Sequence, residues 1–175
     1  MGLVTILDDE VGRLAALNRY DILDTGHEER FDRITKVVEM ALNCPITAIS
    51  LVDAERQWFK SQRGLDVNET PRDMAFCAHT IQGIIPMIVE DAFEDPRFSQ
   101  NPLVLGDPNI RSYLGVPLVS PDGYNIGTLC AIDTAPRKFD DKAIELLSQL
   151  AQLVIDELEL RQRSDKPVET GSLPR

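Results

Sequence analysis

A thiol and an imidazole stand close together in one short segment of this chain. Cys77 and His79 lie within residues 71–81, PRDMAFCAHTI, between two stretches whose residues favour β-strands. Two residues apart, they would share one face of a strand but lie about 200° apart on a helix. The pair is too small for a metal site, and no serine or carboxylate stands nearby in a triad order. The segment therefore indicates part of a pocket wall, and we predict no catalytic and no metal-ligating residues.

A second group of polar side chains follows further along the sequence. Arg111 and Tyr113 would share one face of a strand, because side chains alternate with a period of two. A guanidinium beside a phenol suits a carboxylate or phosphate group on a small ligand. Asp91, at the end of an apolar strand, could hold a ligand amine or pair with Arg111. The structural alternative is an ion pair from Arg111 to Asp91 or Asp95 that pins a loop.

Both residues of the first segment also have structural interpretations. His79 could form a hydrogen bond in a pocket and titrate near neutral pH, or it could tie the segment to a neighbouring loop. Cys77 is flanked by Phe76 and Ala78, so a small buried apolar side chain is the favoured interpretation. These alternatives stay open at the level of the sequence.

Composition limits the class of protein. The 175 residues are 43% hydrophobic and 27% charged, which predicts one soluble domain with a substantial core. The net charge of −11 without a basic cluster argues against nucleic acid as a partner and against anionic membranes. No run of apolar residues approaches the length of a membrane-spanning helix. Three widely spaced cysteines and no secretory leader predict a reducing, cytoplasmic setting.

The elements that must position these residues can be read from the hydrophobic pattern. A first helix is expected over 8–20, with Val11, Leu14, Ala15 and Leu17 as its apolar stripe, and a second through 31–42. Strands are expected over 46–52, 57–62, 87–89, 113–119 and 124–132, with a tight turn at 122–123. Residues 91–110 read as a long loop, functional or mobile. Helices at both ends and antiparallel hairpins between them predict an α+β fold.

The last helix is expected from Asp140, as N-cap, to about residue 163. Its inner stripe comprises Ala143, Ile144, Leu147, Leu150, Ala151, Val154 and Leu158. Leu146, Leu153 and Leu160 widen the apolar arc beyond what packing on one sheet requires. The excess predicts a second partner for this helix, and we favour a homodimer through the terminal helices.

Several blocks of sequence, in order, resemble the GAF domain family. The resemblance covers roughly residues 14–158 and is closest to GAF domains at the N-termini of bacterial sensor histidine kinases and diguanylate cyclases, or standing alone. The blocks that carry it are YDILDT (20–25), ERFDRIT (29–35), ISLVD (49–53), QWFKS (57–61), FCAHTI (76–81), DA (91–92), DPRF (95–98), NP (101–102), IRSY (110–113) and GTLCAID (127–133).

This resemblance implies a central antiparallel sheet with the N- and C-terminal helices on one face and a loop-covered pocket on the other. The implied domains are 1–24 (helix and connector), 25–160 (GAF domain) and 161–175 (disordered tail or linker). The ligand-binding residues expected from the pocket's position are Cys77, His79, Asp91, Arg111 and Tyr113. Cysteine directly precedes histidine in bilin-binding relatives, whereas Ala78 intervenes here, so we predict no bound cofactor.

The resemblance implies a small-molecule-sensing regulatory module, itself non-catalytic, whose signal could reach an output kinase or cyclase domain. The ligand is unknown, because GAF domains bind cyclic nucleotides, bilins, haem, amino-acid-like molecules or nothing known. One alternative is a thiol-dependent reductase of the free methionine sulfoxide type that uses Cys77. Another is a degenerate GAF domain that acts only in dimerisation.

Overall fold

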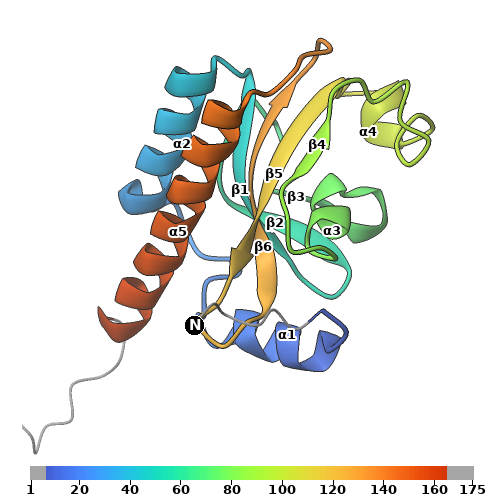
Figure 1. Ribbon diagram of the computed structural model, residues 1–175. Coiled ribbons are helices and arrows are strands. Elements are labelled where there is room, and N and C mark those ends of the chain that lie inside the picture. Colours follow the sequence, from blue (N-terminus) through green and yellow to red (C-terminus); the bar gives the residue numbers. More distant parts are fainter. Residues whose placement is uncertain (1–6, 165–175) are drawn as a thin grey trace, which may run out of the picture.

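A single antiparallel sheet forms the centre of the molecule, with helices on both of its faces (Figure 1). The structure is a computed structural model that describes residues 7–164. Its elements, in chain order, are α1 (Glu10–Asn18), α2 (Glu29–Leu42), β1 (Ile46–Val52), β2 (Arg56–Arg63), β3 (Glu69–Pro71), the 3-10 turn η1 (Arg72–Met74), α3 (Phe76–Thr80), β4 (Met87–Val89), α4 (Pro102–Leu105), β5 (Ser112–Val119), β6 (Asn125–Asp133) and α5 (Asp141–Ser164).

The strand order is β3-β2-β1-β6-β5-β4, and neighbouring strands run antiparallel. The predicted α+β fold is confirmed. The turn between β5 and β6 contains Gly123 at φ +93°, a backbone conformation that glycine adopts without steric cost. β3 was not expected from the sequence, because its residues, ETP, lack the apolar and β-branched run that marks β4, MIV.

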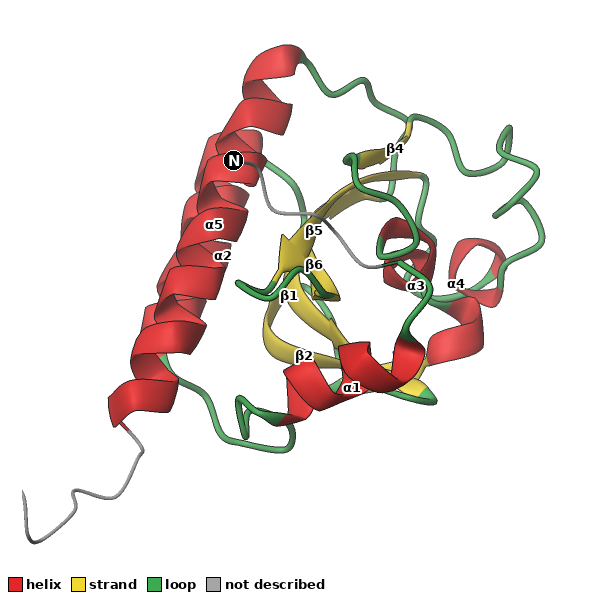
Figure 2. Ribbon diagram, turned by 60° about the horizontal axis from the view of Figure 1, so that its bottom comes forward, coloured by secondary structure: helices red, strands yellow, loops and turns green. Residues whose placement is uncertain are grey.

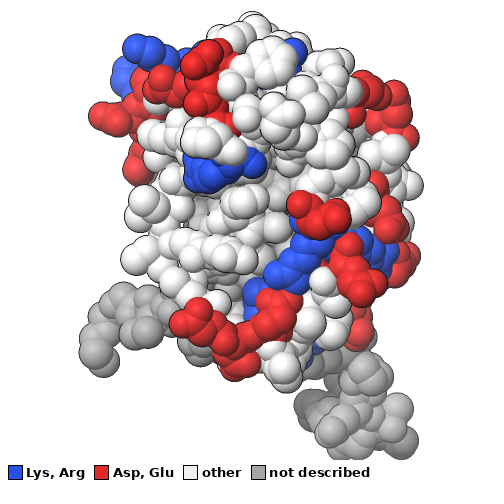
Figure 3. Space-filling model, turned by 90° about the vertical axis from the view of Figure 1, so that its right-hand side faces the viewer, with Lys and Arg blue, Asp and Glu red and all other residues white. Residues whose placement is uncertain are grey.

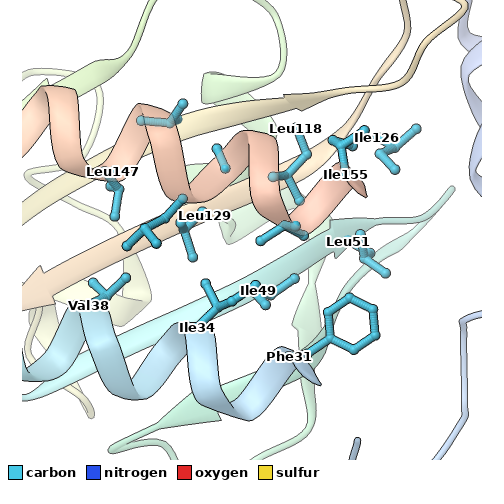
Figure 4. Close-up of a cluster of buried hydrophobic side chains, with 14 of the residues drawn as sticks. Phe31, Ile34, Val38, Ile49, Leu51, Leu118, Ile126, Leu129, Leu147 and Ile155 are labelled. Atoms are coloured by element: carbon cyan, nitrogen blue, oxygen red, sulfur yellow. The ribbon is translucent and has the colours of Figure 1, made fainter. Parts of the chain in front are cut away.

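Helices α2 and α5 lie side by side across one face of the sheet (Figures 1 and 2). Figure 4 shows the apolar layer that they bury, in which side chains from both helices meet those of β1, β5 and β6. The labelled members are Phe31, Ile34, Val38, Ile49, Leu51, Leu118, Ile126, Leu129, Leu147 and Ile155. Asp140 caps α5 as predicted, because its Oδ1 accepts a 2.8 Å hydrogen bond from the Ala143 amide.

Helix α1 crosses one end of the sheet, and its buried face differs from the predicted stripe (Figure 2). Leu17 is buried, but Val11 is 82% exposed and Arg13 is buried instead. The Arg13 guanidinium donates to the Val52 carbonyl at 2.6 Å, where β1 ends. Its aliphatic stem therefore covers the sheet end while its charged group satisfies a backbone acceptor, a role that hydrophobicity does not reveal.

The opposite face of the sheet carries η1, α3, α4 and the segment 91–110. This segment is packed rather than open, because the buried Phe98 ring stacks on Phe76 with ring centroids 4.0 Å apart. The Ala92 amide also donates to the Arg111 carbonyl at 2.6 Å. The segment thus forms a fixed wall over this face.

The ends of the described chain are continuous with the core. Tyr20 and Ile22, from the predicted connector, are buried in the same cluster as α2 and α5. Residues 161–164 belong to α5, and the rest of the predicted tail lies outside the described residues. Between residues 7 and 164, no helix combines the length and the apolar character needed to cross a membrane.

Candidate functional site

A cavity of about 350 Å³ lies on the sheet face opposite α2 and α5. Strands β1, β2, β5 and β6 form its floor, and β3, η1, α3, α4 and two loops form its walls. Its lining is mostly apolar, with a few polar side chains among the rings and methyl groups. The lining residues are Ala48, Gln57, Phe59, Gly64, Leu65, Asp66, Val67, Glu69, Thr70, Pro71, Met74, Phe76, Cys77, Leu103, Asp107, Pro108, Ile110, Tyr113, Cys130 and Ile132.

Cys77 faces this cavity from α3, and hydroxyl groups of the sheet surround its sulfur. The Thr128 hydroxyl donates to Cys77 Sγ at 2.9 Å, and the Tyr113 hydroxyl donates to it at 3.4 Å. Tyr113 also shares a 2.8 Å hydrogen bond with Thr80. The thiol therefore lies in a buried polar spot within apolar surroundings.

These neighbours change how readily Cys77 ionises. Burial raises the pKa of the Cys77 thiol, but the hydrogen bonds from Cys130 and the hydroxyl groups lower it, and the resulting pKa is about 7. The hydrogen bond to Cys77, together with burial, raises the pKa of Cys130 well above its usual value. Of these two thiols, Cys77 is thus the one whose thiolate is stabilised.

Tyr113 lies flat along β5, and a glycine makes this orientation possible. Gly115, two residues further on the same face, has no side chain, and a Cβ there would collide with the Tyr113 ring and hydroxyl. Burial and the nearby Cys77 sulfur raise the pKa of Tyr113 well above its usual value. The phenol therefore stays protonated and acts as a hydrogen-bond donor.

His79 lies on the other side of α3 from Cys77, away from the cavity. Because residues 76–80 form a helix, the 200° separation holds and the two side chains do not meet. The exposed His79 ring packs edge-on against Phe98, with centroids 4.9 Å apart. Burial and the Arg97 charge lower the pKa of His79. It borders a separate, open depression together with Arg72 and Gln82.

Arg111 and Asp91 are also absent from the cavity lining. The Arg111 guanidinium lies over the Phe93 ring, 3.6 Å from its centroid, and donates to the Val104 carbonyl at 3.0 Å. Asp91 Oδ1 accepts from the Phe93 amide at 3.0 Å. Arg111 precedes the first residue of β5, so the alternation that places Tyr113 over the cavity does not extend to it. The predicted pairing of Arg111 with Asp91 or Asp95 is not observed, and Arg111 instead ties 91–110 to the sheet.

Sequence reasoning missed the polar residues in the cavity floor and behind Cys77. Thr128 and Cys130 alternate on β6 with Leu129 and Ala131, which face the helices. Gln57 is buried on β2, accepts from Ser50 at 2.8 Å and donates to Thr70 at 2.7 Å. The period of two along β6 was the available signal, because it puts Thr128 and Cys130 on the face opposite the long helices.

No cluster of side chains suited to a metal ion occurs within residues 7–164. The three cysteines in this range are buried and unbridged. The cavity therefore offers an apolar volume and one thiol of lowered pKa, whose sulfur accepts hydrogen bonds from two hydroxyl groups.

Residues 26–158 match the family model of the GAF domain. A cyclic di-GMP phosphodiesterase of Pseudomonas aeruginosa is 40% identical over 149 residues, which are 85% of this chain and 25% of that protein. The chain thus spans about a quarter of the length of this curated relative.

Two solved structures resemble the fold at low sequence identity. The GAF domain of a phosphoenolpyruvate-protein phosphotransferase from Acinetobacter has a TM-score of 0.66 at 18% identity, covering 94% of this chain and 100% of that one. A free methionine-R-sulfoxide reductase from Neisseria meningitidis, in complex with its substrate, has a TM-score of 0.65 at 19% identity, covering 93% and 98%. At such identities the likeness concerns the fold.

Proposed function

Because the chain belongs to the GAF domain family, we propose that it is a small-molecule-sensing regulatory module of bacterial signal transduction, without catalytic activity of its own. The observation that carries this proposal is the cavity of about 350 Å³ between the sheet and α3. Small-molecule sites are typically apolar hollows of roughly 300–1,000 Å³ with a few placed polar groups. Cys77 and Tyr113 are the proposed ligand contacts among the predicted residues.

Ion pairs offer a route from the cavity wall to the helices at both ends. Arg72 of η1, adjoining α3, contacts Glu10 of α1 at 2.6 Å. Lys60 of β2 contacts Glu28 at 2.6 Å, and the same carboxylate contacts Arg161 of α5 at 2.7 Å. We propose that ligand binding shifts these helices and so biases an output domain or partner.

The output is proposed to be a signalling enzyme, either a kinase, a cyclase or a phosphodiesterase of the kind that the P. aeruginosa relative's name describes. The relative is about four times as long as the matched region, which leaves room for such an activity outside it. We also propose a cytoplasmic location, which three unbridged cysteines support.

A cavity-filling substitution tests whether ligands bind in this cavity. Ala48 is buried in the cavity floor, so Ala48→Leu places extra carbons where a ligand would lie. A metabolite library is screened for compounds that raise the melting temperature of the wild type. A true ligand at a hundredfold excess over its Kd stabilises by about 2.7 kcal/mol. We expect Ala48→Leu to abolish this stabilisation.

The matched control is Ala41→Leu, the same change at an exposed position on α2. It should keep the full ligand-induced shift. A library in which nothing stabilises the wild type, or in which Ala48→Leu responds like Ala41→Leu, would refute sensing at this cavity. The first of these results would favour a degenerate domain that serves only dimerisation.

A thiol-dependent reductase is the second candidate, because Cys130 lies against Cys77, whose pKa is about 7. In such a reaction the Cys77 thiolate attacks the sulfur of a sulfoxide and one proton is taken up from solvent. The sulfoxide oxygen stays on Cys77 as a sulfenic acid while the sulfide leaves. Cys130 then displaces water and forms a disulfide, which an external dithiol reduces. Consumption of free methionine sulfoxide by the wild type but not by Cys77→Ser would establish this activity, and a Cys77 that resists alkylation at neutral pH would eliminate it.

A further inference from the structure

The charges around the cavity have one sign. Three carboxylates border it, those of Asp66, Glu69 and Asp107, and its described lining includes no lysine, arginine or histidine. Glu69 is paired with Arg56 at 3.1 Å, whereas Asp66 and Asp107 form no ion pair with any residue between 7 and 164. Both are exposed, which places two uncompensated negative charges at the rim.

Basic residues next to lining residues in the sequence form their contacts outside the cavity. Arg63 is paired with Glu39 at 3.9 Å and Arg72 with Glu10 at 2.6 Å. Lys60 is buried against Glu28, and its ammonium group also donates to the Thr25 hydroxyl at 2.9 Å. Arg111 donates to backbone carbonyls and covers the Phe93 ring. Figure 3, which looks onto the side that carries α3 and α4, shows uncharged surface over much of this face, with one basic group in its upper part and a band of basic and acidic groups from near its centre toward the lower right.

The cavity floor also has little hydrogen-bonding capacity left. The Gln57 side chain is bonded to Ser50 and Thr70, and the Tyr113 hydroxyl is bonded to Thr80 and Cys77. The remaining interior surface is made by apolar side chains such as Phe59 and Phe76. Burying an anion against such a surface costs several kcal/mol unless a cation or several donors compensate it.

We infer that the cavity selects ligands with a ring-sized apolar body and a neutral or positive charge, and that it rejects anions, nucleotides included. The apolar body of the ligand would pack against Phe59 and Phe76, and a cationic group would lie toward Asp66 and Asp107. This inference rests on the proposed sensing function and specifies the ligand class. A ligand of this class has no carboxylate or phosphate group for Arg111 to bind as the sequence had suggested.

Three probes with the same indole ring test the charge preference. Indole, tryptamine and indole-3-acetate are neutral, cationic and anionic, and each is titrated into the full chain by calorimetry or NMR. Tryptamine should bind at least about tenfold more tightly than indole-3-acetate, a difference of about 1.4 kcal/mol. Added salt should reduce this ratio, because it screens charges at an exposed rim.

Substitutions separate the rim charges from the apolar interior. Asp66→Asn combined with Asp107→Asn should remove most of tryptamine's advantage and leave the affinity for indole unchanged. Glu94→Gln, which removes an exposed carboxylate outside the cavity lining, is the matched control and should change neither affinity. A tryptamine advantage that persists in the Asp66/Asp107 double variant would contradict the role of the rim.

The outcomes distinguish this inference from the function on which it rests. Indole-3-acetate binding as tightly as tryptamine in the cavity overturns the charge preference and leaves sensing intact. Absence of binding by all three probes, while a library metabolite stabilises the wild type but not Ala48→Leu, also overturns it and leaves sensing intact. Absence of binding by the probes and by the whole library overturns both.

Discussion

The hydroxyl groups of the sheet decide the chemistry available to Cys77. In a purely apolar pocket, burial would keep the thiol protonated and unreactive. Here Thr128 donates to its sulfur at 2.9 Å and Tyr113 at 3.4 Å, so a thiolate would form within an existing set of donors. A ligand that enters the cavity therefore meets a sulfur whose charge state can change near neutral pH.

Thr128→Val should raise the pKa of Cys77 above its wild-type value of about 7. Valine keeps the shape of threonine but removes the donor that stabilises the thiolate, and the loss of one such hydrogen bond corresponds to about one pKa unit. The measurement is the ultraviolet absorbance of the thiolate across a pH titration, with Cys77→Ala to identify the signal. The exposed Thr134→Val is the control. An unchanged titration in Thr128→Val would show that this hydroxyl does not set the pKa.

At the scale of elements, one carboxylate joins three parts of the fold. Glu28 precedes α2 and contacts both Lys60 of β2 and Arg161 of α5. The Lys60 side chain is fully buried, and burial lowers its pKa while Glu28 counteracts this effect. The Glu28 carboxylate thereby links the end of α5 to the sheet. A displacement of β2 could therefore be transmitted to α5 through this contact.

Glu28→Gln should destabilise the fold by about 2 kcal/mol, less than for a fully buried pair because Glu28 is partly exposed. The substitution leaves two neighbouring cations without the carboxylate between them. Urea denaturation at neutral pH measures the effect. Glu29→Gln, at the next residue and in an exposed ion pair with Arg33, should cost less than about 0.5 kcal/mol. Equal effects of the two substitutions would contradict the proposed role of Glu28.

The contribution of Glu28 should also depend on pH in a defined direction. Burial raises the pKa of Glu28, but hydrogen bonds from Lys60 and Arg161 lower it, to a net value below the usual 4.5. Its stabilisation is therefore complete above pH 4.5 and is lost as the pH falls through the lowered folded-state pKa. The difference in stability between wild type and Glu28→Gln should shrink in acid. A difference that stays constant to low pH would exclude this linkage.

At the scale of the whole molecule, the outer surface of the helical layer is partly apolar. Met40 on α2 and Leu153 and Leu160 on α5 are exposed, with 71%, 49% and 50% of their surface accessible. The helices already bury their inner stripes against the sheet, so these side chains need no further contact within the chain. We propose that they form a homodimer interface in which the same surface of two copies meets.

Sedimentation equilibrium at micromolar concentration should therefore give twice the 19.6 kDa of one chain. Leu153→Lys should shift the mass to that of a monomer, because it places a charge in the proposed interface. The thermal stability of the fold should not fall. Leu105→Lys, the same change at an exposed leucine on α4, should leave the dimer intact. A wild-type protein that sediments only as a monomer would refute the proposed homodimer.

The sequence by itself determined that helices pack on an antiparallel sheet and which face of several elements is buried. The period of two in β5 and β6, the turn at 122–123 and the stripe of α5 are local patterns, and local patterns specify which face of an element is buried. They were sufficient to place α5 against an antiparallel sheet, to identify Asp140 as its cap and to put Tyr113 on a strand face. The residues of α1 were misassigned because Arg13 is buried through a long-range bond to Val52.

Only the tertiary structure decided which polar groups meet. Cys77 and His79 are near in sequence but face opposite sides of α3, whereas Cys77 and Thr128 are 51 residues apart and form a 2.9 Å hydrogen bond. Arg111 was expected in the pocket, yet its guanidinium satisfies the Val104 carbonyl. The side chains that share the cavity come from paired strands and from the helices and loops packed over them. Contacts between such distant segments leave no local pattern in the sequence.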